Sequence, residues 1–246
     1  MEPADCVIIA IDGPAGSGKT TLARGLAREL GMAYLGTGAT YRALALKALR
    51  EGLDPMNDLA AMRLARSAKI EVLLGPEAGG EQRVLLDGED VTDQLQGNLV
   101  SVASSMISRH SDVRKTIVEL QRALVAGFCK SASGAGEGGP MVAGVIVEGR
   151  DIGTVVFPDA VVKIYLDAGL EERARRRLAD FNEHQATLPE AMESILRRDV
   201  SDIQRTASPL KPAPEAVIVD NTNWPAEKTL SHALKIVRDK LAASSK

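Results

Sequence analysis

An eight-residue segment near the start of the chain, Gly-Pro-Ala-Gly-Ser-Gly-Lys-Thr at residues 13–20, places the strongest limit on the fold. It fits the pattern GxxxxGK[ST], in which glycines let the backbone curl so that successive N–H groups point at one anion. A continuous apolar run, Val7–Asp12, precedes this segment, and Leu22, Leu26 and Leu30 follow it at a spacing of four residues. We therefore expect a buried strand, a phosphate-binding loop (P-loop) and an amphipathic helix, in that order.

The P-loop pattern predicts a role for each kind of residue in it. The backbone amides would hold the phosphates of a nucleotide triphosphate, Lys19 would reach the β- and γ-phosphates, and the Thr20 hydroxyl would bind Mg²⁺. A glycine-rich turn that fits the pattern by chance is the alternative, but the strand before it and the helix after it favour a nucleotide site. We assign ATP binding to Gly13, Pro14, Ala15, Gly16, Ser17, Gly18, Lys19, Thr20 and Thr21.

Short β-branched runs alternate with helical patterns along most of the chain, which is typical of an α/β fold with a parallel sheet covered by helices. With 246 residues, the chain is long enough to bury a large core. Ser111 is expected to be the N-cap of a helix that starts near Val113. Further strands are expected at 144–147, 161–166 and 216–220, and helices at 40–51, 58–67, 113–128, 170–181, 188–200 and 226–243.

Two segments interrupt this alternation. Ile70–Leu74 and Gln82–Leu86 are strand-like runs, and Asp87 with Gly88 forms a turn signal after the second. This pattern predicts a small antiparallel insert that is attached to the main body rather than woven into its sheet. The second segment, residues 131–140, is rich in glycine and serine and is expected to be a flexible surface loop.

Composition excludes several classes of protein. The chain has 30 Lys and Arg against 33 Asp and Glu, and only 3% of its residues are aromatic, so it lacks the basic surplus and the stacking residues of a nucleic-acid-binding module. No apolar stretch approaches the ~20 residues of a membrane span, and the acidic N-terminus does not fit a secretory signal. Cys6 and Cys129 are too few for a disulfide framework or a closed zinc site. We expect a soluble, cytoplasmic protein without nucleic-acid or membrane partners.

Arginines in polar, loop-like contexts point to a second phosphate. The chain has neither the Asn-Lys-x-Asp base reader of GTPases nor the Leu-Ser-Gly-Gly signature of transporter ATPases. Arginine suits bidentate capture of phosphate oxygens, although any single arginine is more often an exposed surface residue. Glu148–Asp151 directly follow a buried strand, where open α/β sheets bind their ligands. The arginines in question are Arg42, Arg114, Arg150, Arg198 and Arg205.

These motifs occur together in a characteristic order. After the P-loop come Thr-Gly-Ala-x-Tyr-Arg at 37–42, Ser105 nine residues before Arg114, Glu-Gly-Arg-Asp-Ile-Gly-Thr-Val-Val-Phe-Pro-Asp at 148–159, and Arg-Asp-x-x-Asp-x-x-Arg at 198–205. In this combination the chain resembles the bacterial cytidylate kinase family, from about Val7 to Leu241. The block after Glu148 is the most specific part of the resemblance.

The resemblance implies a single kinase domain over residues 1–246 with the P-loop NTPase fold and a five-stranded parallel sheet. It implies a CORE at 1–67, 105–169 and 190–246, an antiparallel NMP-binding insert at 68–104 and a short helical LID at 170–189. The implied reaction transfers the γ-phosphoryl group of ATP in line to CMP or dCMP, with Mg²⁺ and without a covalent intermediate. We expect a monomer.

The resemblance also implies roles for individual residues. The acceptor phosphate would be held by Thr37, Arg42, Arg150 and Arg205, and the sugar hydroxyls by Arg198 and Asp202. The cytosine edge would be recognised by Ser105, Arg114 and Asp151, since a carboxylate accepts from the N4 amino group and repels the O4 of uracil. The catalytic residues would be Lys19, Arg150 and, from the LID, Arg173 and Arg177.

The chain departs from the family pattern at two places. Position 36 is Gly where the family usually has Asp, and Gln96 with Gly97 stand where Ile-Arg-Thr is common. We therefore expect a looser turn at Thr37 and an effect on substrate affinity rather than on the type of reaction. Two other functions remain as alternatives. One is a kinase of another acceptor, such as UMP, on the same scaffold, and the other is a nucleotide-binding regulatory module that has lost efficient phosphoryl transfer.

Overall fold

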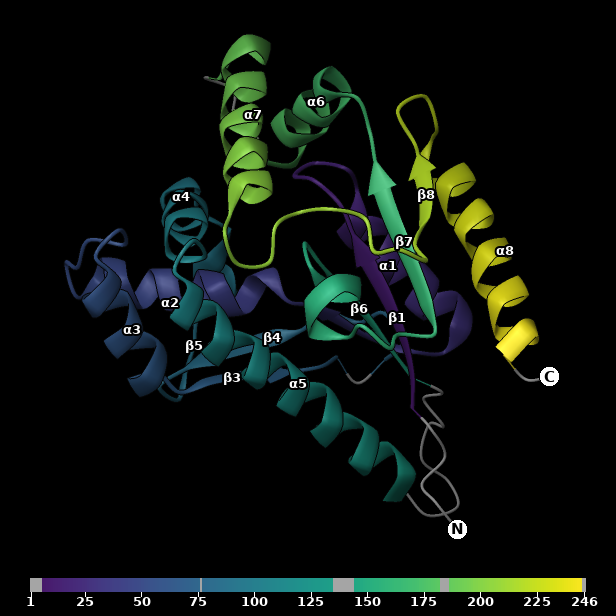
Figure 1. Ribbon diagram of the computed structural model, residues 1–246, viewed down its shortest axis with the longest axis horizontal. Helices are drawn as coiled ribbons and strands as arrows, with labels where there is room; N and C mark the ends of the chain where they lie inside the picture. Colours follow the sequence, from purple (N-terminus) through teal and green to yellow (C-terminus); the bar gives the residue numbers. More distant parts are fainter. Residues whose placement is uncertain (1–5, 76, 135–143, 182–185, 245–246) are drawn as a thin grey trace.

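A parallel sheet forms the centre of the computed structural model, which describes residues 6–75, 77–134, 144–181 and 186–244 (Figure 1). The strand order is β2-β6-β1-β7-β8, and every neighbouring pair is parallel. The strands are β1 (Val7–Asp12), β2 (Ala33–Gly36), β6 (Gly144–Gly149), β7 (Val162–Asp167) and β8 (Val217–Asp220). The predicted five-stranded sheet is confirmed, and β2 is the one strand that the pattern of apolar runs did not locate.

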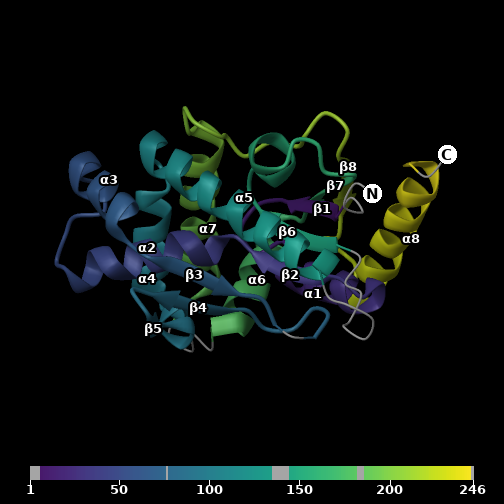
Figure 2. The same ribbon diagram turned by 90° about the horizontal axis from the view of Figure 1, so that it is seen from below.

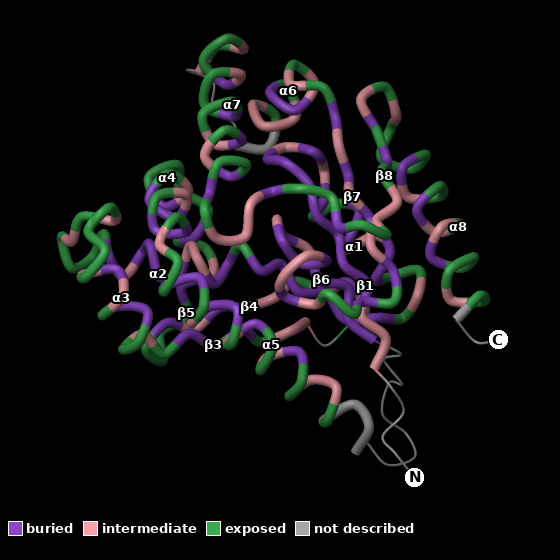
Figure 3. The backbone as a smooth tube through the Cα atoms, in the orientation of Figure 1, coloured by how far each residue is buried: buried purple, intermediate pink, exposed green. Residues whose placement is uncertain are grey.

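Helices cover both faces of this sheet (Figure 2). Side chains alternate along β1, so Ile9 and Ile11 pack beneath α1 (Lys19–Leu30) and α8 (Ala226–Ser244), while Ala10 belongs to the core on the opposite face. That opposite face is covered by α2 (Gly38–Arg50) and α5 (Ser111–Gly134). The buried residues of both cores lie along the central strands (Figure 3).

The predicted antiparallel insert is a separate three-stranded sheet. Its strands are β3 (Ile70–Leu73), β4 (Arg83–Leu86) and β5 (Glu89–Asp90), flanked by α3 (Asp58–Ser67) and a short 3₁₀ helix, η1 (Thr92–Gln96). The turn between β4 and β5 is made by Asp87 and Gly88, both with positive φ. No strand of this insert pairs with the parallel sheet among the described residues, as predicted.

The helices around residue 110 differ from the prediction. The sequence did not indicate α4 (Asn98–Ile107), and α5 begins at Ser111 itself. Ser111 is therefore the first helical residue and not the N-cap, because the first bond of the helix runs from the Arg114 amide to the His110 carbonyl at 3.0 Å. Since α5 continues to Gly134, the first four residues of the loop expected at 131–140 are helical, and the rest lies outside the described residues.

The segment around the expected LID is a pair of helices, α6 (Leu170–Phe181) and α7 (Leu188–Gln204). They pack around a small apolar cluster of their own, formed by Ala174, Ala191 and Ile195. A capping box, in which Thr187 and Glu190 satisfy each other, fixes the start of α7. Because α7 is continuous to Gln204, the expected LID boundary at residue 189 falls inside its first turn.

The two cysteines form one disulfide, Cys6–Cys129, which ties the residue before β1 to α5. Two cysteines are too few for a framework of disulfides, and this single crosslink was not predicted. Among the described residues, no helix combines the length and the apolar character that a membrane span requires.

Candidate active site

A cavity of about 340 Å³ opens at the carboxyl ends of β1, β2 and β6, between the P-loop and helices α4 and α7. One lysine and seven arginines line it, against three carboxylates. The excess of positive charge gives the cavity a field that attracts polyanions, although the whole chain has a net charge of −3.

The P-loop forms one wall of the cavity. Gly16 and Gly18 have φ values of 75° and 87°, in the left-handed region that favours glycine. A Cβ at Gly16 would also lie 2.8 Å from the carbonyl oxygen of Arg173. Because α1 starts at Lys19, its N-terminal amides face the cavity. Of the nine residues assigned to ATP, those that line the cavity are Ala15, Gly16, Gly18, Lys19, Thr20 and Thr21.

Lys19 is the buried cation of this wall. Its Nζ donates to the Pro14 carbonyl at 2.7 Å and to Ser17 Oγ at 3.4 Å. Burial, and after it the positive charge of Arg150, lower the pKa of Lys19 to about 7. Negative charge beside Nζ would raise the pKa of Lys19 again and stabilise its ammonium form. The site therefore favours a ligand with several negative charges.

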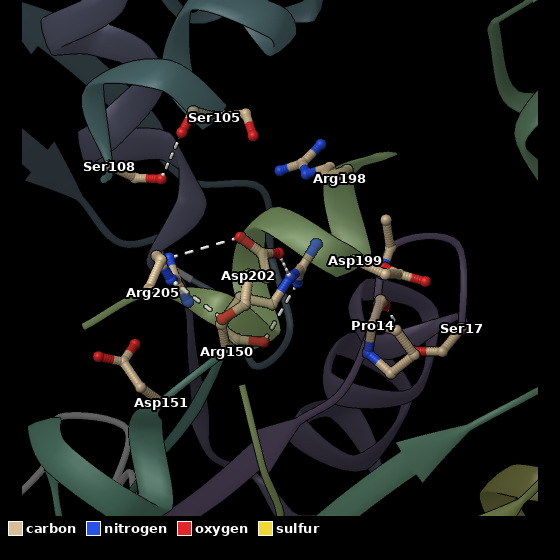
Figure 4. Close-up of polar contacts among 12 residues, drawn as sticks. Pro14, Ser17, Ser105, Ser108, Arg150, Asp151, Arg198, Asp199, Asp202 and Arg205 are labelled. Carbon is tan, nitrogen blue, oxygen red and sulfur yellow. Dashed lines mark hydrogen bonds and ion pairs between the residues drawn. The ribbon is translucent and has the colours of Figure 1, made fainter. Parts of the chain in front are cut away.

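A second cluster lies across the cavity, where Asp202 sits between two arginines (Figure 4). Arg150 Nε donates to Asp202 Oδ2 at 3.1 Å, and Arg205 Nη1 lies 3.5 Å from Asp202 Oδ1. Burial favours the neutral acid, but the charges of Arg150, Arg205 and Arg198 outweigh it and lower the pKa of Asp202. Arg205 itself is the C-cap of α7.

A buried ion pair forms the floor beneath α4. Arg114 Nη2 donates to Asp151 Oδ2, and both side chains are almost fully buried. Arg114 Nη1 also donates to the Ser108 carbonyl at 3.3 Å, and Ser108 Oγ donates to the Ser105 carbonyl at 2.9 Å. Carboxylate, guanidinium and hydroxyl groups thus meet in one corner, which suits the edge of a polar heterocycle.

Comparison with known proteins identifies the family, since the cytidylate kinase family matches residues 9–239. The chain belongs to that family. It is an ATP-dependent kinase, and the reaction of the family is phosphorylation of CMP. The chain is similar to three curated cytidylate kinases: that of Pelotomaculum thermopropionicum (46% identity over 229 residues, 90% of this chain and 92% of that one), that of Mycobacterium avium (42% over 242 residues, 95% and 96%) and that of Geobacillus kaustophilus (40% over 237 residues, 96% and 98%).

All nine residues assigned to the acceptor line the cavity of this kinase. Several of them hold buried nitrogens without a hydrogen-bond partner among the described residues: the Nε of Arg42, Arg114 and Arg198, and Nη2 of Arg205. Buried donors are seldom left unsatisfied, so these nitrogens mark where an anion belongs. The nine residues are Thr37, Arg42, Ser105, Arg114, Arg150, Asp151, Arg198, Asp202 and Arg205.

The arginines of α6 are arranged differently from the prediction. Arg173 does not line the cavity, because it lies behind the P-loop, donating to the Ala15 carbonyl at 3.1 Å and to Asp199 at 2.5 Å. Arg177 does line the cavity, and so does Arg176, whose Nη1 donates to the Ser17 carbonyl at 3.3 Å. Spacing along one helix could not tell these arginines apart, since all of them follow Glu172 closely on the same short helix.

Proposed function

We propose that this kinase holds its two nucleotides at opposite walls of the one cavity, ATP on the P-loop and CMP or dCMP among the arginines that surround Asp202. The observation that carries this proposal is the set of unpartnered guanidinium nitrogens on arginines that line the same cavity as the P-loop lysine. An acceptor phosphate held by two of these arginines, Arg42 and Arg205, would share that cavity with a γ-phosphate held at Lys19.

In this proposal the acceptor binds through three groups of residues. Its base contacts the corner beneath α4, where Asp151 accepts from the N4 amino group of cytosine. The phosphate is held by Thr37, Arg42, Arg150 and Arg205, the sugar hydroxyls by Arg198 and Asp202, and the base by Ser105, Arg114 and Asp151. Support comes from the arrangement in Figure 4, where Arg150 and Asp202 lie between the base corner and the P-loop.

The transfer itself needs positioning and charge neutralisation, not a covalent intermediate. Lys19, Arg176 and Arg177 line the donor end and would stabilise charge on the transferring phosphoryl group. Arg173, which stands behind the loop, would act by holding the Ala15 carbonyl in place.

Magnesium fits the donor end by the chemistry of its residues. The Thr20 hydroxyl and a carboxylate oxygen of Glu148 lie 3.0 Å apart beside Lys19, and both are hard oxygen donors of the kind Mg²⁺ prefers. We propose that Thr20 holds the ion. When bound, Mg²⁺ would neutralise part of the negative charge on the phosphates.

The helical pair α6–α7 is proposed to be the LID, extending the expected segment at 170–189, and the antiparallel sheet to be the NMP-binding part. The separate apolar cluster of α6 and α7 supports motion of that pair relative to the core, whereas the buried residues of the antiparallel sheet share an apolar core with β2 and β6. Closure would exclude water and so prevent hydrolysis of ATP. We also propose that the kinase acts as a cytoplasmic monomer.

A coupled assay of ADP formation tests this proposal. Purified protein with ATP and Mg²⁺ is expected to form ADP rapidly with CMP or dCMP, slowly with UMP and negligibly without an acceptor. Equal rates with CMP and UMP would indicate a kinase of broader acceptor range, and no acceptor-dependent ADP would indicate a regulatory module.

A further inference from the structure

Two buried polar side chains have no role in the assignments above, and both contact the P-loop from outside the cavity. They are Asp199 of α7, which lies beside Pro14 (Figure 4), and Asn221, the residue that follows β8. Neither residue lines the cavity, yet each is hydrogen-bonded to the backbone of the P-loop. Because burial of a carboxylate or an amide costs free energy unless its hydrogen bonds are satisfied, two such groups on one loop indicate a common role.

Arg173 and Asp199 hold the peptide groups on both sides of Ala15. The Ala15 amide donates to Asp199 Oδ1 at 3.4 Å, and the Ala15 carbonyl accepts from Arg173 Nη1 at 3.1 Å. Arg173 Nη1 also donates to Asp199 Oδ2 at 2.5 Å, and its Nε donates to the Ala168 carbonyl at 2.8 Å. The ion pair thus holds the P-loop from behind and is itself fixed to the end of β7.

Asn221 holds a second P-loop carbonyl. Its Nδ2 donates to the Ser17 carbonyl at 3.2 Å, and its Oδ1 accepts from Arg176 Nη1 at 3.1 Å. The backbone fixes its position, since the Asn221 amide donates to the Asp167 carbonyl at 3.0 Å. The side chain therefore has both of its polar atoms engaged, and these two bonds determine its orientation.

These contacts determine which way the P-loop amides point. A trans peptide group places its N–H opposite its C=O, and the carbonyl of one residue belongs to the same group as the amide of the next. The donors from Arg173 and residue 221 that hold the carbonyls of Ala15 and Ser17 lie outside the cavity lining. The amides of Gly16 and Gly18, residues that do line the cavity, are therefore turned toward it. Amides of this kind are the groups with which a P-loop binds phosphate.

We propose that Arg173, Asp199 and Asn221 form a rear brace of positioning residues: by fixing the backbone of the P-loop from behind, they keep its phosphate-binding amides directed at the nucleotide. This inference rests on the proposed binding of ATP at the P-loop. A glycine-rich loop loses much conformational freedom when it is ordered. A loop that is ordered before the ligand arrives does not charge that loss against binding.

The acceptor side of the cavity is fixed by different contacts. The Gly36 amide donates to Gln82 Oε1 at 2.7 Å, and Gln82 Nε2 donates to the Gly36 carbonyl at 3.1 Å. The next residue, Thr37, donates its hydroxyl to the Glu148 carbonyl at 2.8 Å. The looser turn expected at Thr37 is thus not observed. Because none of these contacts involves the rear brace, loss of the brace should leave the binding of CMP unchanged.

Calorimetric titration with inorganic tripolyphosphate tests the brace, because this probe has the phosphate chain of ATP but neither base nor sugar. CMP is present at saturation to occupy the acceptor arginines, and EDTA removes divalent ions. Asn221→Leu removes the donor to the Ser17 carbonyl without a change in charge. It is expected to raise the dissociation constant of tripolyphosphate about three- to tenfold, the usual effect of losing one hydrogen bond. The dissociation constant of CMP, titrated alone, is expected to equal that of the parent.

Asp199→Asn is a second variant, for which charge and orientation predict opposite results. Removal of a negative charge near the P-loop would by itself strengthen the binding of an anion. We expect weaker binding of tripolyphosphate instead, because an amide has one acceptor oxygen where the carboxylate uses two, one toward Ala15 and one toward Arg173. Stronger binding would remove Asp199 from the brace.

Thr222→Val is the matched control. Thr222 is the neighbour of Asn221, but its hydroxyl is hydrogen-bonded to Asp220 and to the Gly169 amide rather than to the P-loop. This variant is expected to bind tripolyphosphate as the parent does. A residue that only supports the fold would lower the melting temperature, or weaken tripolyphosphate and CMP alike.

Unchanged binding of tripolyphosphate by folded Asn221→Leu, or equal weakening of tripolyphosphate and CMP, overturns the inference. If that variant does not fold, Asp199→Asn decides by the same criteria. Failure of the parent protein to bind tripolyphosphate in the presence of CMP would instead overturn the proposed function.

Discussion

Arg150, at the carboxyl end of β6, donates its Nε–H to the carboxylate of Asp202 on α7, 52 residues later in the chain. The bond joins the central sheet to the helical pair α6–α7. It also holds both side chains at the cavity. The pair therefore couples the position of the helices to the geometry of the proposed acceptor site.

Arg150→Ala is expected to weaken the binding of CMP far more than the binding of ATP. Loss of a charge-assisted hydrogen bond to the acceptor phosphate costs about 1.5–3 kcal/mol, so KM for CMP should rise roughly 10- to 100-fold while KM for ATP changes little. Initial rates with each substrate varied in turn measure this. Arg175→Ala is the control, since Arg175 is an exposed arginine of α6 paired with Glu171 outside the cavity. Equal effects of Arg150→Ala on the KM values of both substrates would contradict the assignment of Arg150 to the acceptor phosphate.

Lys19→Met is expected to abolish most of the transfer while the fold stays intact. The substitution removes a charge aimed at the donor phosphates, and loss of one such stabilising group typically lowers kcat by about 10²–10³. Burial makes the charged ammonium of Lys19 costly in the folded state. The melting temperature should therefore not fall when methionine replaces it. Turnover and thermal unfolding are measured on the same preparation, and retention of turnover would contradict the role of Lys19.

Asp151→Asn is expected to change the choice of acceptor base. The amide can donate to O4 of uracil, so kcat/KM for CMP should fall by about one to two decades while that for UMP holds or rises. In the structure Asp151 is paired with buried Arg114, and a role limited to that pair would impair both acceptors alike. The ratio of kcat/KM for CMP and UMP distinguishes the two roles.

Asp12 gives the chain a stability that depends on pH. Burial raises the pKa of Asp12 from 3.8 to about 6, against the opposing hydrogen bonds from the Gly153 and Ile152 amides. The folded state thus binds this proton more tightly than the unfolded state, and the stabilisation is complete below pH 3.8 and lost as pH rises through about 6.

The Asp12→Asn variant has no titrating group at this position. As the pH falls from 7 to 5, the unfolding free energy of the parent protein should rise by about 1 kcal/mol relative to that of this variant. Urea unfolding of both proteins at pH 5, 6 and 7 measures the difference between them, so that other titrating groups cancel. A difference that does not vary with pH would mean that Asp12 has the same proton affinity in both states.

Local patterns in the sequence predicted the elements whose own residues determine them. Val7–Asp12 is a strand with those bounds, and α3 and α6 also have the predicted bounds, because apolar periodicity and capping residues act within a few positions. In contrast, β2 is only four residues long, and α4 is rich in serine, so neither carries enough local signal. Their formation depends on neighbours in space, β6 for the strand and α2 for the helix.

The residues of the site could be named from the sequence where they occur in motifs, but the contacts between distant segments could not. The P-loop and the nine acceptor residues occur in motifs, and the structure brings those nine residues to one cavity. Arg173 and Arg176 share one helix, and each donates to a P-loop carbonyl. They differ in their other partners, Asp199 for Arg173 and Asn221 for Arg176, which no spacing along α6 indicates. The hydrogen bonds from Tyr34 and Thr20 to Glu148 join three separate segments, so no spacing along the chain indicates them.

The position of β1 in the sheet has a consequence for biosynthesis. β1, which leads into the P-loop, is synthesised before its neighbours in the sheet, β6 and β7. A nascent chain that already carries the complete P-loop motif can therefore still lack both flanking strands. Contacts so distant in sequence form late in folding. A nucleotide that binds only the assembled site would stabilise chains in which β6 and β7 have joined β1.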